Sequence, residues 1–299
     1  MKVMTREVFV SEMNDPKITV VTPSFNQGQY LEQTIRSVLG QQYPDLEYII
    51  IDGGSTDASV EIIKKYEKCL TYWVSEPDRG QAHAINKGFA RATGDIICWL
   101  NSDDMYLPGT LSSIASALDV NKSQLLFGNC LHFAQDGIDA YGSDVRGVSE
   151  KRDLLLADYV IQPSSFWTRE AWRATGPLDE SLHFSFDWDW FIRAQNAGVS
   201  FKPVDPYLSI SRIHAEHKTG VGGDRRRREL ATIYARYAGP KYERLFARCL
   251  TSRSRIAFSR RVIWTCRLSR FEGTALKLAF PLLFLGFGRD EISDMMTML

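Results

Sequence analysis

Two neighbouring carboxylates, Asp103 and Asp104, directly follow the apolar segment IICWL and close the run Asn101, Ser102, Asp103, Asp104. Adjacent carboxylates repel one another, which is costly unless a cation or solvent relieves the repulsion. Hard divalent ions such as Mg²⁺ take oxygen ligands and usually share them with phosphates. The pair therefore predicts a metal site that binds a diphosphate. The alternative is a solvated acidic turn ahead of Pro108.

A third carboxylate, Asp52, ends the apolar run LEYIIID and is followed by GGSTDAS. A carboxylate at the end of a strand can accept a hydrogen bond from a base imide or a ribose hydroxyl. Asp52 is therefore a candidate nucleotide contact. The alternative is a capped turn in which Ser55, Thr56 and Asp57 satisfy free backbone amides.

Carboxylates and aromatic side chains alternate at Asp187, Trp188, Asp189 and Trp190, where a helix is expected to begin. Shielding by aromatic rings should raise the pKa of Asp187, which suits a general base that accepts a proton from a hydroxyl group. Trp188 could offer a stacking face to a sugar ring. The alternative is that Asp187 caps the helix while both tryptophans pack inside the protein.

Two histidines, His214 and His217, occur in the segment RIHAEHKT. A pair with this spacing has weak metal specificity, and a structural or surface role is the alternative. The segment precedes a change in composition, where a loop that closes over a site could end. His214 is therefore a candidate metal or phosphate contact.

The elements that must position these side chains alternate between apolar runs and amphipathic segments. Strands are expected at KITVVTPS, LEYIIID, LTYWVSE and DIICWL, and helices at about 30–39, 59–66, 81–91 and 187–196. Asn26 is the predicted N-cap of the first helix. The alternation predicts an α/β fold with a mainly parallel sheet and helices on its faces. Ligands of such sheets bind beyond the carboxyl ends of the strands.

Composition narrows the class of protein. The 299 residues carry 36 basic and 36 acidic side chains, which argues against a nucleic-acid partner. The N-terminal segment lacks the apolar stretch of a signal peptide, and no segment reaches the roughly 18 apolar residues of a membrane-spanning helix. Five scattered cysteines show no metal-binding spacing and suggest a reducing compartment, so a cytoplasmic location is expected.

An Arg-rich, helical composition after Thr219 places a boundary near Gly222. It divides a domain at 1–222 from a basic C-terminal extension at 223–299. The extension interleaves arginines with apolar residues and contains the run ALKLAFPLLFLGFG. One interpretation is a helix that lies on the inner face of the cell membrane, near a lipid-linked acceptor. The alternative is a helical subdomain that packs on the core with a solvated basic face.

Three segments together resemble the family 2 inverting glycosyltransferases, which share the nucleotide-diphospho-sugar transferase fold called GT-A. They are VVTPSFNQGQYLEQTIRSVLGQQYPDLEYIIIDGGSTDAS, SEPDRGQAHAINKGFARATGDIICWLNSDD and DESLHFSFDWDWFIRA. The resemblance covers roughly residues 17–220. It implies these site residues: Pro23, Phe25 and Asp52 at the base, Gly80 and Gln81 in the donor pocket, Asp103 at the ribose, Asp104 and His214 at the metal, and Asp187 as catalytic base.

The chain departs from the family pattern at two positions. Phe186 stands where the family has Glu before its catalytic Asp, and Asn101 stands where many members have the first Asp of the metal motif. Asp104 is therefore the metal ligand expected to matter most.

The implied reaction is transfer of a sugar from a nucleotide diphosphate sugar, by default UDP-linked, to an acceptor hydroxyl, with Mn²⁺ or Mg²⁺ as cofactor and with inversion. The implied acceptor is a saccharide or lipid-linked saccharide in cell-surface polysaccharide or glycolipid assembly. A non-catalytic sugar-nucleotide-binding protein of the same fold is the alternative. A Rossmann dehydrogenase is disfavoured because no GxGxxG run follows the first strand.

Overall fold

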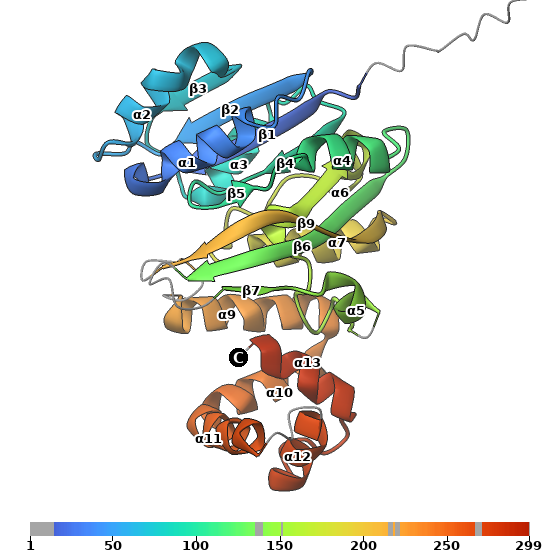
Figure 1. Cartoon of the computed structure of the whole chain (residues 1–299). Helices are drawn as coiled ribbons and strands as arrows, with labels where there is room; N and C mark the ends of the chain where they lie inside the picture. Colours follow the sequence, from blue (N-terminus) through green and yellow to red (C-terminus); the bar gives the residue numbers. More distant parts are fainter. Residues whose placement is uncertain are drawn as a thin grey trace, which may run out of the picture.

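The computed structural model describes residues 15–134, 140–150, 152–214, 218, 222–266 and 271–298. Within these residues one sheet has the strand order β3-β2-β1-β4-β8-β6-β9-β5, and β7 pairs with β6 (Figure 1). The strands are β1 (Ile18–Ser24), β2 (Leu46–Asp52), β3 (Tyr72–Ser75), β4 (Ile96–Trp99), β5 (Met105–Tyr106), β6 (Gln124–Ala134), β7 (Ala140–Gly142), β8 (Ser165–Thr168) and β9 (Ser200–Ile213).

The N-terminal half of the sheet is parallel. β1 pairs in parallel with β2 and β4, and β2 pairs in parallel with β3. Strand β8 runs antiparallel to β4 and β6, whereas β6 and β9 are parallel. Every residue of β1 and β4 is buried, as expected for parallel strands that helices cover on both faces. The predicted α/β fold with a mainly parallel sheet is confirmed.

The helices between the strands are α1 (Gly28–Leu39), α2 (Ser59–Tyr66), α3 (Gln81–Phe89), α4 (Thr110–Ala117), α5 (Val145–Ser149), α6 (Arg169–Thr175) and α7 (Phe186–Asn196). Helices α1, α2, α3 and α7 agree with those expected from the sequence, whereas α4, α5 and α6 were not expected. Helix α3 packs closely on β1, since a Cβ atom at Gly88 would lie 2.4 Å from Val21 Cγ1.

The predicted N-cap of α1 is wrong. Gln27 occupies that position, and Asn26 has a positive φ of 51°. The Asn26 side chain instead accepts a hydrogen bond from Thr56 N at 2.9 Å. The free amide of Gly28 donates to Asp57 Oδ2 at 2.8 Å, and Asp57 Oδ1 accepts from Ser59 N at the start of α2. One carboxylate therefore caps two helices, which a search for caps next to each helix does not find.

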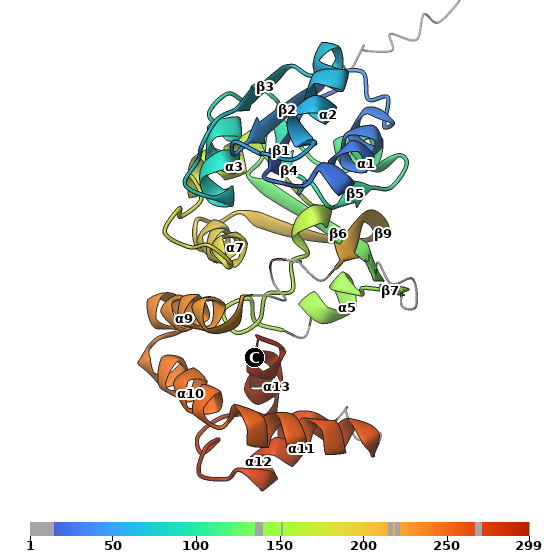
Figure 2. The same cartoon turned by 90° about the vertical axis from the view of Figure 1, so that its left-hand side faces the viewer.

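The C-terminal region is helical, as predicted. It contains α9 (Gly223–Ile233), a π-helical segment (Tyr234–Ala238), α10 (Pro240–Thr251), α11 (Arg253–Thr265), α12 (Glu272–Ala279) and α13 (Arg289–Met298). In Figures 1 and 2, α9 lies between the sheet and the other C-terminal helices, which form the end of the molecule away from β3. None of the described helices has the length and apolar character needed to cross a bilayer.

The apolar core is continuous across the predicted boundary at Gly222. One cluster of buried side chains includes Trp188 and Trp190 of α7 together with Tyr234, Phe246 and Met295 of the C-terminal region. Tyr234 is fully buried, and its hydroxyl donates to Leu156 O at 2.8 Å. The boundary itself stays a prediction, but packing contacts cross it.

Candidate active site

A cavity of about 690 Å³ opens beyond the carboxyl ends of β1, β2 and β4, next to the first residues of α3 and α7. Its volume falls within the range of small-molecule sites. Of the residues predicted to form a site, these line it: Pro23, Phe25, Gly80, Gln81, Asp103, Asp104 and Asp187. The position beyond the strand ends is where ligands of open α/β sheets bind.

Asp104 lies on one wall of the cavity and is only 4% exposed. Its Oδ1 accepts from Arg212 N of β9 at 3.2 Å, and its Oδ2 accepts from Asn101 Nδ2 at 3.2 Å. Burial and the charge of neighbouring Asp103 raise the pKa of Asp104 well above its usual value. A cation at this wall would therefore stabilise the charged form of Asp104.

His214 reaches the site through Asp103. Its Nε2 lies 3.0 Å from Asp103 Oδ2, and its ring centre lies 4.8 Å from that of Tyr30. The His214 side chain is only 3% exposed and does not line the cavity. In this arrangement His214 orients Asp103, and its predicted contact with a metal or phosphate stays a prediction. His217 lies outside the described residues.

The donor set at this wall is small. No three or more His, Cys, Asp or Glu side chains among the described residues gather closely enough to hold a metal ion. Two carboxylates remain, Asp103 and Asp104, and Mg²⁺ is usually bound by one or two carboxylates together with substrate phosphates and water. The residues present therefore fit a metal that arrives with a diphosphate rather than one held by the protein alone.

Asp52 does not line the cavity. It is fully buried, and Oδ2 accepts from Ser55 N at 2.8 Å, Gly54 N at 3.1 Å and Ser75 Oγ at 2.6 Å. Its Oδ1 accepts from Ser55 Oγ at 2.5 Å. These contacts enclose the Asp52 carboxylate, and its predicted role as a nucleotide contact stays a prediction. Direct contact between Asp52 and a bound base would require the turn to rearrange.

Asp78 is the carboxylate that lines the cavity beside this turn. Its Oδ1 accepts from Gly80 N at 2.7 Å, which holds the backbone of Gly80 at a φ of +118°. Its Oδ2 faces the Gly53 turn, because a Cβ atom at Gly53 would lie only 2.7 Å from it. Phe25 is 59% exposed and contributes to the same part of the cavity. Asp78 was not among the site residues predicted from the sequence.

Asp187 lies in the first turn of α7 and lines the same cavity as Phe25 and Asp78. Burial raises the pKa of its carboxyl group, the direction expected from the sequence. Its Oδ1 accepts from Trp188 N at 2.8 Å. A carboxylate of raised pKa is a stronger proton acceptor than an exposed one, as a general base requires.

The predicted stacking role of Trp188 is wrong. Trp188 is 1% exposed, and its indole N–H donates to Leu154 O at 2.8 Å. Trp190 is also fully buried, so both tryptophans pack inside the protein, as the alternative held. The aromatic side chains that do line the cavity include Phe184 and Phe186.

Lys218 places a cation in the cavity that the sequence analysis missed. Its Nζ donates to Gln81 Oε1 at 2.7 Å and lies 5.1 Å from the ring centre of Phe186. Burial lowers the pKa of Lys218 to about 8, against the opposing effect of the Asp187 and Glu229 charges. In the sequence, Lys218 is a single Lys in RIHAEHKT, and nothing in that segment indicates that it would enter the cavity.

Polar side chains link Lys218 to the acidic wall. Gln81 Nε2 donates to Asn101 Oδ1 at 2.7 Å, and Asn101 Nδ2 donates to both Asp104 Oδ2 and Gln162 Oε1. Asn101 therefore uses both ends of its amide to hold this network. Because residue 101 is Asn here and not Asp, the wall carries one negative charge fewer, and the Asn101 amide can donate a hydrogen bond to Asp104.

Helix α9 supports the cavity from the C-terminal region. Glu229 accepts from the backbone amides of His183, Phe184 and Ser185 at 2.9, 2.6 and 3.2 Å. These residues precede α7, and His183 and Phe184 line the cavity. Glu229 follows the four consecutive arginines 225–228, and it was not among the predicted site residues.

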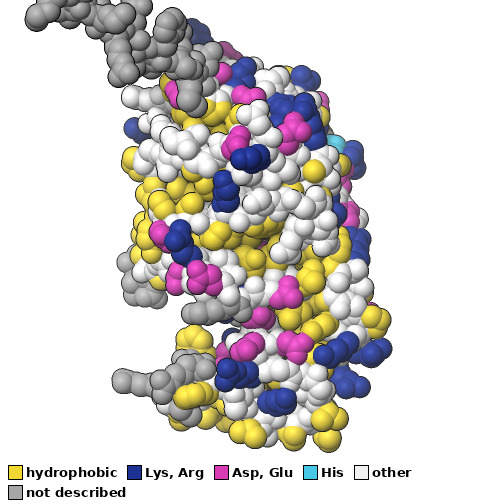
Figure 3. Space-filling model, turned by 90° about the vertical axis from the view of Figure 1, so that its right-hand side faces the viewer, with side chains coloured by type: hydrophobic (Ala, Val, Ile, Leu, Met, Phe, Trp, Pro, Cys, Tyr) yellow, Lys and Arg dark blue, Asp and Glu magenta, His cyan; other side chains and the backbone are white. Residues whose placement is uncertain are grey.

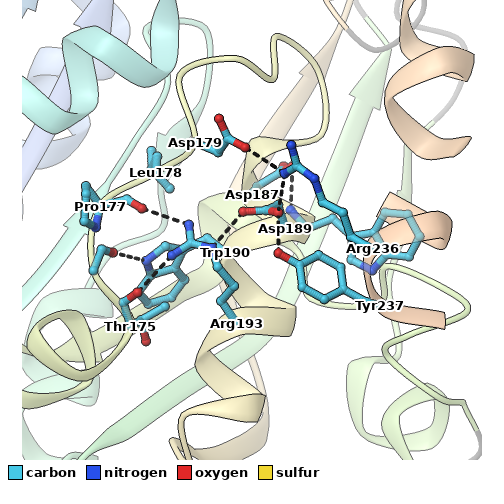
Figure 4. A network of polar contacts seen from close by, with 12 residues as sticks. Thr175, Pro177, Leu178, Asp179, Asp187, Asp189, Trp190, Arg193, Arg236 and Tyr237 are labelled. Atoms are coloured by element: carbon cyan, nitrogen blue, oxygen red, sulfur yellow. Dashed lines mark hydrogen bonds and ion pairs between the residues drawn. The ribbon is translucent and has the colours of Figure 1, made fainter. Parts of the chain in front are cut away.

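A second contact fixes α7 itself (Figure 4). Asp189 is 1% exposed and accepts from Arg193 Nε at 2.8 Å and from Tyr237 Oη at 2.7 Å, with Arg236 NH1 at 3.4 Å. Tyr237 and Arg236 belong to the π-helical segment after α9. The helix that carries Asp187 is thus anchored to the C-terminal region.

Comparison with known proteins identifies related sequences. The family model described as glycosyl transferase family 2 matches residues 19–165. An uncharacterized glycosyltransferase of Mycobacterium tuberculosis is 40% identical over 217 residues, which cover 70% of this chain and 78% of that protein. The GalNAc(5)-diNAcBac-PP-undecaprenol beta-1,3-glucosyltransferase of Campylobacter jejuni is 29% identical over 152 residues, 48% of this chain and 49% of that protein.

Two solved structures share the fold. The mannosyltransferase PcManGT from Pyrobaculum calidifontis, in complex with GDP-Man and Mn²⁺, matches with a TM-score of 0.58 at 17% identity, over 75% of this chain and 64% of that chain. S. aureus TarS 1-349, in complex with UDP-GlcNAc, matches with a TM-score of 0.56 at 15% identity, over 94% and 90%. The GT-A fold expected from the sequence is confirmed.

Proposed function

The chain belongs to glycosyltransferase family 2, and from this premise we propose that it transfers a sugar from a nucleotide diphosphate sugar to an acceptor hydroxyl with inversion at the anomeric carbon. One observation carries the proposal. A single cavity is lined by the acidic pair Asp103 and Asp104, by Lys218, and by Asp187 at the start of α7. Such a cavity offers groups for a diphosphate and a proton acceptor in the same space.

The donor diphosphate is proposed to lie between the acidic pair and Lys218. The pair, with Asp104 as the principal ligand, would hold a divalent metal, Mn²⁺ or Mg²⁺, that neutralises charge on the departing phosphate. Lys218 would add a second positive charge near the departing diphosphate. A preorganised cation of this kind stabilises the negative charge that develops on the leaving group. PcManGT was solved with Mn²⁺, which supports the choice of metal.

The nucleotide is proposed to lie over Pro23, Phe25 and Gly80, with Asp103 at the ribose. Asp52 would act indirectly by holding the turn at Gly53. UDP is the default nucleotide, and TarS 1-349 was solved with UDP-GlcNAc. GDP is the other nucleotide to test, because PcManGT was solved with GDP-Man.

Asp187 is proposed to be the catalytic base. Its carboxylate accepts the proton of the acceptor hydroxyl while the hydroxyl oxygen forms a bond to the anomeric carbon. The bond from that carbon to the diphosphate oxygen breaks, and the nucleoside diphosphate leaves with the electron pair. Lys218 counteracts the effect of burial on the pKa of Asp187 and so favours its charged form.

The acceptor is proposed to be a saccharide or a lipid-linked saccharide used in cell-surface polysaccharide or glycolipid assembly, on the cytoplasmic side of the membrane. The name of the Campylobacter relative includes an undecaprenol-linked saccharide, which supports a lipid-linked acceptor.

The proposal is tested by turnover of nucleotide sugars. Purified protein is incubated with UDP-, GDP-, CDP- and dTDP-sugars and Mg²⁺ or Mn²⁺, and release of nucleoside diphosphate is followed. We expect one donor to be consumed and Asp187→Asn to lower the rate by about 10²–10⁴-fold. Donor affinity should stay within a few-fold, since Asn keeps the size of the side chain.

The outcomes separate the two functional classes. Binding without turnover of any donor, with or without a saccharide acceptor, would favour the non-catalytic binding protein. Equal rates for the wild type and Asp187→Asn would exclude Asp187 as the base.

A further inference from the structure

The end of the molecule formed by α11, α12 and the segment after α12 exposes large apolar side chains. Phe258 is 71% exposed, Leu278 78%, Leu282 84% and Leu285 75%. Exposed apolar groups of this size, gathered on one part of a surface, mark an interaction site more often than chance placement does. In Figure 3 yellow side chains gather at the end of the molecule opposite the N-terminal part of the sheet, with dark blue side chains nearby.

Helix α11 has two distinct faces. Ile256 and Ile263 are buried against the protein, whereas Phe258 and Val262 are exposed. Residues three and four positions apart share a helix face. Phe258 and Val262 therefore point outward together, while the buried isoleucines fix the opposite face.

Cations flank this outward face. Arg255 and Arg261 are both exposed, and each lies three residues from Phe258 along α11. The Arg255 guanidinium also lies 5.6 Å from the ring centre of Phe280, which brings α11 next to the segment that carries Leu282 and Leu285. Apolar groups edged by arginines are typical of helices that lie in a membrane interface.

The charge of the region has one sign. From Arg253 to Leu285 the sequence has six Arg and one Lys, but only one acidic residue, Glu272. Glu272 already accepts from Arg260 Nε at 2.6 Å. Clustered Arg and Lys side chains attract anionic lipids. The excess of positive charge next to the apolar face therefore favours a partner that carries negative charge.

A basic cavity opens at the beginning of α11. It has a volume of about 390 Å³ and is lined by Arg227, Arg228 and Arg253 together with Asp224. Asp224 is already paired with Arg227. Guanidinium groups bind phosphate oxygens well, so the cavity could take a lipid headgroup.

We propose that the surface formed by Phe258, Val262, Leu278, Leu282 and Leu285, with Arg255 and Arg261, docks on a bilayer that contains anionic lipids. The apolar side chains enter the interface, and the arginines contact phosphate groups. Docking would bring the transferase to a lipid-linked acceptor, but it does not depend on the identity of the donor or on catalysis.

The experiment uses the full chain and vesicles of phosphatidylcholine, with or without phosphatidylglycerol, in a sedimentation assay. We expect the protein to sediment with the anionic vesicles and to be released by added salt, because salt screens the charges. The double variant Phe258→Ser, Leu282→Ser should lower vesicle binding by at least about tenfold, and so should Arg255→Ser, Arg261→Ser. Both should keep the thermal unfolding midpoint of the wild type, which shows that they fold.

Tyr141→Ser is the matched control, because Tyr141 is a 56% exposed aromatic residue on β7, outside this surface. It should sediment like the wild type. Absence of vesicle binding, or binding that neither double variant changes, would overturn the proposal. A concentration-dependent dimer without lipid, lost in Phe258→Ser, Leu282→Ser, would instead assign the surface to a second copy of the chain and would also overturn it.

Discussion

At the scale of single residues, the carboxylates of Asp52 and Asp78 have different surroundings. Asp52 is enclosed by its own turn, whereas Asp78 lines the cavity. We predict that Asp52→Asn lowers the free energy of unfolding by about 1–3 kcal/mol, because buried donors lose a charged acceptor. Asp78→Asn should instead weaken nucleotide binding by roughly tenfold with a smaller effect on stability.

Thermal unfolding and nucleotide titration of the two variants distinguish these roles. If Asp52→Asn loses nucleotide binding while its unfolding curve is unchanged, then Asp52 contacts the base directly and the turn must open when the nucleotide binds.

A second residue-scale prediction concerns pH. Lys218 faces Asp187 on α7 and Glu229 and Arg225 on α9, and its pKa is lowered to about 8 by burial. The charged form therefore dominates below pH 8 and is lost as the pH rises through that value. We predict that nucleoside diphosphate affinity falls over the same range.

The matched variant is Lys218→Met, which keeps an unbranched side chain, one atom shorter, and has no charge. It should bind the nucleotide about 10–100-fold more weakly at neutral pH, as expected for loss of a charged hydrogen bond. Its affinity should no longer fall near pH 8. The same fall in Lys218→Met would assign the titration to another group.

The pH dependence of folding stability runs in the opposite direction to that of nucleotide affinity. Between pH 8 and the usual pKa of 10.5, Lys218 binds fewer protons in the folded protein than in the unfolded chain. The unfavourable contribution of Lys218 to stability therefore becomes smaller as the pH rises.

At the scale of elements, two sets of contacts hold the N-terminal end of α7. Glu229 binds the amides ahead of it, and Asp189 within it binds Arg193, Arg236 and Tyr237. We predict that Asp189→Asn lowers the free energy of unfolding by about 1–3 kcal/mol, since Arg193 and Tyr237 lose a charged acceptor that is only 1% exposed. Donor turnover should fall as well, because α7 positions Asp187.

Glu170→Gln is the matched control. Glu170 pairs with Arg173 at 2.6 Å on the exposed surface of α6, so its loss should cost less than about 1 kcal/mol. Chemical denaturation measures both variants. Equal losses of stability would show that the Asp189 contacts do not anchor the helix.

The sequence predicted these elements to different degrees. Strand ends and helix starts have local patterns, so Asp103, Asp104 and Asp187 could be found from buried apolar runs and the residues that follow them. Lys218 could not, because it meets Gln81 across 137 residues of sequence, and no local pattern encodes that contact. Asp52 differs from both: its place at a strand end is that of a ligand contact, and Gly54, Ser55 and Ser75 donate hydrogen bonds to it, so its role at the base stays a prediction.

At the scale of the whole molecule, the two predicted parts depend on each other. The composition changes near Gly222, but the core continues from α7 into α9, α10 and α13. A boundary in composition reports the change in surface charge, whereas packing depends on the buried side chains, which stay apolar on both sides. For this reason the docking surface is better tested by point variants than by removal of the extension.

The central claim is that the cavity binds a nucleotide diphosphate between the acidic pair and Lys218. Calorimetric titration of the purified chain with UDP, GDP, CDP and dTDP, with and without Mn²⁺ or Mg²⁺, tests it most directly, with Asp104→Ala as the variant and thermal unfolding as the check on folding. We predict that one nucleotide binds, that metal strengthens its binding, and that folded Asp104→Ala loses the metal effect. Binding of none of the four, or binding that neither metal nor Asp104→Ala changes, would contradict the account.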